Sequence, residues 1–91
     1  MEVKVFATLR DVVGGKSVSV DVGSGISVQQ LLAQVLDKYP ALRPKLLTED
    51  GQLNSAVHIL VNGRDVRFLQ GLETVVTAKD TVQMFPPVGG G

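Results

Sequence analysis

The sequence predicts an α+β fold in which one main helix packs on one face of a single mixed β-sheet. Sixteen of the 91 residues are valine, a β-branched residue that suits strands, and many of these valines alternate with polar residues. The segment from Val28 to Tyr39 instead repeats its apolar residues at the spacing of a helix. A chain of this length forms one domain.

The first two strands are expected to form an antiparallel hairpin. Residues 3–9 form an extended segment in which Val3, Val5 and Ala7 share one face. A Gly14-Gly15 break follows, and residues 17–22 then alternate strictly between valine and polar residues. Two alternating runs separated by a glycine-containing loop are typical of a hairpin.

The main helix is expected to begin after a Gly23-Ser24-Gly25 connection. Ser27 and Gln30 have the spacing of a capping box at a helix start. The helix should end at Pro40, and residues 41–47 have room for a second short helical turn. Its apolar stripe comprises Val28, Leu31, Leu32, Val35, Leu36 and Tyr39.

Strands return in the C-terminal half of the chain. Residues 56–61 form one, closed by an Asn62-Gly63 turn, and residues 81–85 form the last, stopped by Pro86-Pro87. Residues 64–77 predict a short edge strand and irregular chain. This order of elements matches the β-grasp, or ubiquitin-like, fold, in which the first and last strands lie side by side at the centre of the sheet. We expect a β-grasp domain over residues 1–85 and a flexible, glycine-rich tail over residues 86–91.

The composition excludes several classes of function. The chain has no cysteine, so a disulfide scaffold, a thiolate metal site and a cysteine nucleophile are all excluded. Nine basic residues balance nine acidic ones, and the chain has three Phe, one Tyr and no Trp. These numbers argue against binding to nucleic acid. No apolar run is long enough to span a bilayer, so we expect no membrane partner and a soluble, cytoplasmic domain.

The sequence contains no recognisable set of catalytic side chains. His58 is the only histidine, so we expect no metal site, and we interpret His58 as an exposed strand residue. The Gly23-Ser24-Gly25 segment lies between a strand and a helix, as a dinucleotide-binding loop would. However, Val28 stands where that motif needs its third glycine, so the segment is interpreted as an ordinary connection.

Strand alternation predicts an apolar patch on the face of the sheet opposite the helix. Neighbouring strands of a β-grasp sheet should bring Phe6, Leu60 and Phe85 to that face, together with His58. Exposed apolar patches usually mark partner-binding sites. The alternative is that a loop or the Phe68-Leu69 segment folds over the patch. The residues expected on the inward face are Val3, Val5, Val57, Ile59, Val61, Val82 and Met84.

The C-terminal segment is the second candidate site. Pro86 and Pro87 stiffen the exit from the sheet, and the six residues from Pro86 onward span about 20 Å when extended. A segment without side chains can enter a narrow channel and present a terminal carboxylate to a buried catalyst. That carboxylate is ionised at neutral pH and can attack the α-phosphate of ATP. The alternative is an idle terminus. The remaining residues of this segment are Val88, Gly89, Gly90 and Gly91.

Three sequence pieces together resemble a known family. FATLRD, NGRDVRF and FPPV followed by terminal glycines are similar to the ubiquitin-like sulfur carriers. These include the molybdopterin synthase small subunits, the archaeal ubiquitin-like small modifiers and the sulfur carriers of cysteine biosynthesis. The resemblance covers essentially the whole chain.

The resemblance implies a mechanism that uses no resident cofactor. An E1-like enzyme would use ATP to adenylate the carboxylate of Gly91, and sulfur transfer would convert it to a thiocarboxylate. Gly90 and Gly91 would be the reactive pair, and Phe6 and Phe85 match aromatic partner contacts of the synthase small subunits. Leu60, Pro86, Pro87, Val88 and Gly89 complete the expected partner-binding surface.

The role within this family stays open between three readings. The first is the small subunit of molybdopterin synthase, acting with the large subunit. The second is a protein modifier conjugated to lysines of target proteins, and the third is a β-grasp interaction module with an idle tail. The segment NGRDVRFLQGL is absent from the shortest synthase subunits and present in the archaeal and cysteine-carrier branches. Ala78-Lys79-Asp80 stands where these relatives usually have an Asp-Gly-Asp turn. The sequence therefore does not decide the pathway.

Overall fold

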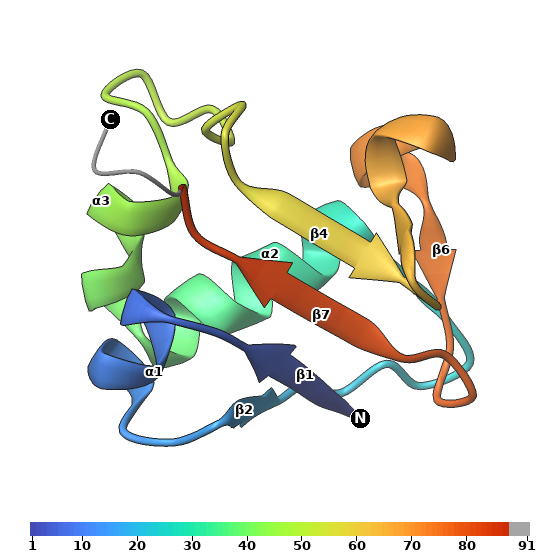
Figure 1. Cartoon of the computed structure of the whole chain (residues 1–91). Coiled ribbons are helices and arrows are strands. Elements are labelled where there is room, and N and C mark those ends of the chain that lie inside the picture. Colours follow the sequence, from blue (N-terminus) through green and yellow to red (C-terminus); the bar gives the residue numbers. More distant parts are fainter. Residues whose placement is uncertain (88–91) are drawn as a thin grey trace.

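The centre of the molecule is a parallel pair formed by the first and last strands (Figure 1). In the computed structural model, which describes residues 1–87, β1 (Glu2–Val5) pairs with β7 (Val82–Phe85). The other strands of this sheet are β2 (Ser17–Ser19), β4 (His58–Val61) and β5 (Arg64–Asp65), all paired antiparallel. The order is β2-β1-β7-β4-β5. The predicted β-grasp arrangement is confirmed.

Helix α2 (Val28–Lys38) lies across one face of this sheet (Figure 1). Its start is fixed by the capping box that the sequence predicted. The Ser27 hydroxyl oxygen accepts the backbone N–H of Gln30 at 3.1 Å, and the Gln30 side chain accepts that of Ser27 at 2.9 Å. These bonds satisfy donors that a helix start otherwise leaves unpaired. The helix buries Val28, Leu31, Leu32 and Val35.

The hydrophobic core lies between α2 and the inward face of the sheet. Strand alternation placed seven of the expected inward residues correctly, since each is no more than 6% exposed. Burial on one face and polarity on the other fixes the register, because a shift of one residue would expose the entire apolar set. These residues are Val3, Val5, Ile59, Val61, Val82 and Met84 on the strands, and Val57, which directly precedes β4.

Residues 6–13 differ from the expected strand. The extended chain ends at Val5, and Ala7, with φ 53°, turns it into helix α1 (Thr8–Val13). Ala7 is exposed, so its predicted place on the inward face is wrong, whereas Leu9 is buried. Gly14 closes the helix in the left-handed conformation (φ 69°) and donates its N–H to the Arg10 carbonyl at 2.9 Å.

A second, two-stranded sheet was not predicted. Strand β3 (Ile26–Ser27), which directly precedes α2, pairs antiparallel with β6 (Val75–Val76). Strand β2 is shorter than expected, although Val20 and Val22 beyond it are buried. The short helices are η1 (Pro40–Leu42), α3 (Arg43–Leu46), η2 (Val66–Phe68) and η3 (Gly71–Glu73), of which η1 and α3 form the helical turn expected over residues 41–47.

The two connections at residues 62–63 and 23–25 are turns, as the sequence predicted. Asn62 and Gly63, with φ 53° and 82°, join β4 to β5 as a hairpin turn with both central residues at positive φ. The Gly23-Ser24-Gly25 segment follows an antiparallel pair, not a parallel unit, and Gly25 donates its N–H to the Val22 carbonyl at 2.7 Å. It is an ordinary turn. Within residues 1–87, no helix has the length and apolarity needed to cross a membrane.

Candidate functional site

Phe6 and Phe85 stack on each other at one edge of the outward face of the sheet. Their ring centroids are 4.4 Å apart and their planes differ by 7°. The contact follows from topology, because β1 and β7 run parallel with Val5 opposite Met84. Phe6, the residue after β1, therefore meets Phe85, the last residue of β7. Both rings are half-buried. The predicted placement of these two residues on one face is correct.

Arg10 completes this aromatic pair, and the sequence analysis missed it. Its guanidinium carbon lies 4.8 Å from the Phe6 ring centroid, and its Nε donates to the Val5 carbonyl at 2.8 Å. A cation over an aromatic face contributes about 0.5–1 kcal/mol at an exposed site. The available signal was helix α1 itself: Leu9, Val12 and Val13 have helical spacing before a glycine stop.

Leu60 lies on the same face of the sheet but apart from the stacked pair. Its cross-strand neighbours are Gln83 on β7 and Asp65 on β5, whereas the residue opposite Phe85 is His58. The expected continuous patch is therefore a stacked aromatic pair plus a separate, half-buried leucine. The Phe68-Leu69 segment does not fold over the patch, since Phe68 is 81% and Leu69 38% exposed.

His58 belongs to a small polar cluster beside Phe85. Its Nδ1 lies 2.9 Å from Asp65 Oδ2, and Arg67 Nη1 lies 3.5 Å from the same oxygen. Burial opposes the ionisation of Asp65, but hydrogen bonds from His58 and from the Arg67 backbone N–H outweigh it and hold the pKa of Asp65 below its ordinary value. His58 is exposed, as interpreted from the sequence. Residues 1–87 contain no group of three or more His, Asp or Glu side chains placed to hold a metal ion.

The chain leaves the sheet next to the aromatic pair. Pro86 follows Phe85 directly and is buried, and Pro87 is half-buried. Packing therefore continues for two residues after β7. The other predicted site residues of this segment, Val88, Gly89, Gly90 and Gly91, lie outside the described residues.

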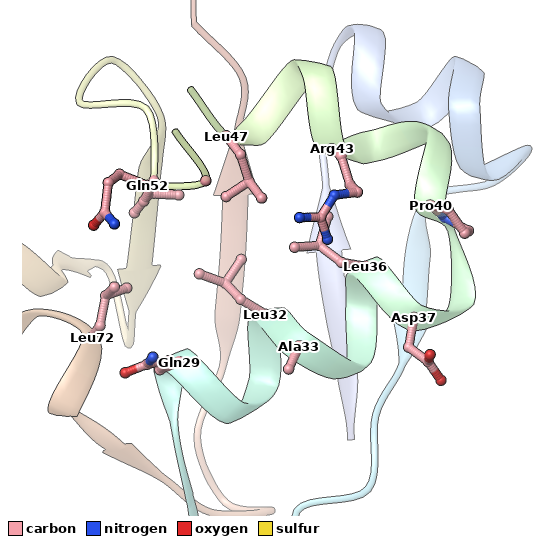
Figure 2. A pocket seen from close by; sticks show the side chains of 12 residues that line it. Gln29, Leu32, Ala33, Leu36, Asp37, Pro40, Arg43, Leu47, Gln52 and Leu72 are labelled. Carbon is pink, nitrogen blue, oxygen red and sulfur yellow. The ribbon is translucent and has the colours of Figure 1, made fainter. Parts of the chain in front are cut away.

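A hollow of about 570 Å³ lies elsewhere, between α2 and the segment that follows α3 (Figure 2). Leu32, Leu36 and Leu47 extend into it, and Asp37 and Arg43 lie at its rim. None of the residues predicted for the functional site lines it. The candidate site is the stacked pair on the opposite face of the sheet and the segment that follows it.

Comparison with known proteins places this geometry in a family. Residues 3–91 match the ThiS family. Small archaeal modifier protein 3 of Haloferax volcanii is 40% identical over 91 residues, which cover 100% of this chain and 98% of that protein. Sulfur carrier protein CysO of Mycobacterium tuberculosis is 35% identical over 92 residues, covering 98% of this chain and 96% of that protein.

Solved structures agree with the sequence matches. The crystal structure of SAMP1 from Haloferax volcanii has a TM-score of 0.85 at 35% identity and covers 100% of this chain and 98% of that one. A chain of the Amycolatopsis orientalis BexX/CysO complex has a TM-score of 0.78 at 33% identity, with 99% and 98% covered. The chain therefore belongs to the ThiS family and is a ubiquitin-like protein of the group that contains sulfur carriers and small modifiers.

Proposed function

We propose that this protein is a sulfur carrier whose Gly91 carboxylate is activated by an E1-like partner enzyme. A carboxylate oxygen attacks the α-phosphorus of ATP, pyrophosphate leaves, and an acyl-adenylate forms. A hydrosulfide equivalent from a sulfur donor then attacks the carbonyl carbon, AMP leaves, and a thiocarboxylate remains. ATP is a substrate of the partner enzyme, and we place the reaction in the cytoplasm, where ATP is available.

The observation that carries the proposal is the position of the Phe6–Phe85 stack beside the point where the chain leaves the sheet. Both rings face away from the core, so a partner that covers them also receives the segment that begins at Pro86. Buried aromatic residues commonly dominate the binding energy of interfaces. The sheet face thus binds the partner and the tail reacts, with Leu60, Pro86 and Pro87 at the margin of the contact.

The molecule that reacts with the activated C-terminus distinguishes two finer roles. In the first, the thiocarboxylate donates sulfur to a pterin intermediate in complex with a molybdopterin synthase large subunit, as the sequence resemblance implies. In the second, the lysine amine of a target protein attacks the carbonyl carbon of the acyl-adenylate, AMP leaves, and an isopeptide bond forms. The 40% identity to a small archaeal modifier protein over the whole chain supports the second role.

Incubation with ATP and the cognate activating enzyme tests the proposal. Pyrophosphate should be released, and after addition of a sulfur donor the intact mass should show one oxygen replaced by one sulfur. Addition of the synthase large subunit and the pterin intermediate, or of a lysine-bearing target protein, then separates the two roles. A terminus that stays inert with a competent enzyme would leave only a β-grasp interaction module.

A further inference from the structure

A basic hollow adjoins the Phe6–Phe85 stack on the outward face of the sheet. Its volume is about 380 Å³, and Phe6 is one of its walls. Three cationic side chains, Lys4, Arg10 and Lys16, line it together with a single carboxylate, that of Glu2. The whole chain is neutral, with nine basic and nine acidic residues. Positive charge is therefore concentrated at this place on the surface.

The carboxylate in the hollow is already engaged by hydroxyl groups. Ser17 Oγ donates to Glu2 Oε1 at 2.8 Å, and the Ser19 hydroxyl donates to Oε2. These two bonds, with that of Ser19 the stronger cause, lower the pKa of Glu2. Glu2 thus carries its full charge at neutral pH, and the hollow keeps a net excess of two positive charges.

The three cations form no ion pair within residues 1–87. The ion pairs in that part of the chain both involve Asp65, on the other side of β7, with His58 and Arg67 as partners. Arg10 is held in place by its bond to the Val5 carbonyl and by its contact with the Phe6 ring. A guanidinium positioned in this way loses little further entropy when it binds a carboxylate.

We infer that the partner surface that receives Phe6 and Phe85 carries carboxylates opposite Lys4, Arg10 and Lys16. The inference rests on the proposed function, because it describes the activating enzyme that covers the aromatic pair. Phe6 is shared by the stack and the hollow, so a protein that buries the ring also covers the cations. Burying cations without opposite charges is unfavourable, so the enzyme supplies Asp or Glu side chains there.

The same three cationic side chains also affect the rate at which the protein associates with the activating enzyme. Complementary charge patches raise association rates by roughly tenfold or more at low salt, and this advantage fades as salt screens the charges. Lys4 and Lys16 are exposed and contribute mainly to this steering. Arg10, fixed against the ring, contributes mainly to the lifetime of the complex.

The test compares two double variants that change the net charge equally. K4E/K16E alters the hollow, and R43E/K79E alters exposed cations outside it. With the cognate activating enzyme, K4E/K16E should associate about tenfold more slowly than the native chain at low ionic strength, and the two should converge at high salt. R43E/K79E should remain close to the native rate. Thermal melting of each variant verifies folding.

Three results would overturn the inference. One is equal association rates and equal salt dependence for the two double variants while the native chain is still adenylated, which leaves the proposed function intact. Another is binding of a single-stranded oligonucleotide that K4E/K16E abolishes while enzyme binding is unchanged. The third is a loss of enzyme binding that persists unchanged at high salt. Absence of pyrophosphate release from the native chain, despite normal salt-dependent binding, would instead contradict the proposed function alone.

Discussion

Asn62 and Asp80 connect the turn after β4 to the loop before β7 through a hydrogen bond of 2.9 Å between Asn62 Nδ2 and Asp80 Oδ1. The Asn62 side chain also accepts the backbone N–H of Thr81 at 2.9 Å, and the other Asp80 oxygen accepts that of Thr77 at 2.8 Å. One polar cluster therefore fixes both connections. It explains how Ala78-Lys79-Asp80 forms a stable turn without a central glycine.

This cluster makes part of the stability dependent on pH. The hydrogen bonds from Asn62 and then from the Thr77 N–H lower the pKa of Asp80 below its ordinary 3.8. A carboxylate with a lowered folded-state pKa stabilises the fold above its unfolded pKa, and that contribution is lost as the pH falls through the folded value. D80N should therefore be less stable than the native chain at pH 7, and the difference should shrink below about pH 3.8. Urea unfolding of both proteins at pH 7 and below about pH 3.8 measures the difference in the free energy of unfolding. A difference that is the same at both pH values would contradict the lowered pKa of Asp80.

The aromatic pair should be required for partner binding but dispensable for folding. F85E places a charge where a partner pocket expects a ring, so binding to the activating enzyme should weaken by more than about 2 kcal/mol, measured by calorimetry. The control is F68E, at a ring that is 81% exposed and lies outside the stack. If F85E unfolds the domain while F68E does not, the outward assignment of Phe85 is wrong.

The C-terminal glycine should be required for activation but not for docking. Deletion of Gly91, or addition of one residue after it, should stop pyrophosphate release while calorimetric affinity for the enzyme stays unchanged. G91A is the finer variant, because a displacement of about 1 Å at a reacting group can slow a reaction about a hundredfold. Full activity of the extended chain would show that a free Gly91 carboxylate is not the reacting group.

The capping box of α2 should contribute measurably to stability. S27A removes the oxygen that accepts the Gln30 N–H and should lower the free energy of unfolding by about 0.5–2 kcal/mol. S24A, in the exposed turn just before β3, is the matched control and should change little. Equal effects of the two changes, measured by urea unfolding, would show that the cap is not a source of stability.

The parts of the fold that could be predicted from sequence depend on local or periodic signals. Ser27 and Gln30 predict the helix start, because both partners of the capping box lie within one helical turn. Strand parity correctly placed Val3, Val82 and Met84 in the core, because a period of two allows only one burial pattern. The turn at residues 62–63 was predictable for the same local reason.

The parts that could not be predicted depend on contacts between distant residues. The pairing of β3 with β6 joins two-residue strands that have no periodic signal of their own. The alternating pattern of Val3 and Val5 extends to Ala7 in the sequence. In the structure the positive φ of Ala7 turns the chain out of the strand. That turn also places Arg10 over the Phe6 ring. The alternation of residues along the strands therefore could not predict the basic hollow. The stacking of Phe6 on Phe85 needs the exact register of β1 on β7, and alternation excludes a shift of one residue but not a shift of two.

The central parallel pair has a mechanical consequence. The N-terminus lies at the start of β1 and the chain leaves β7 at the opposite end of the pair (Figure 1). Tension between the two ends of the domain is therefore directed along the strands and loads the rungs at Val3–Val82, Lys4–Gln83 and Val5–Met84 together in shear. Tension across the β1–β2 hairpin would break its rungs one at a time, so single-molecule pulling should require more force in the first geometry.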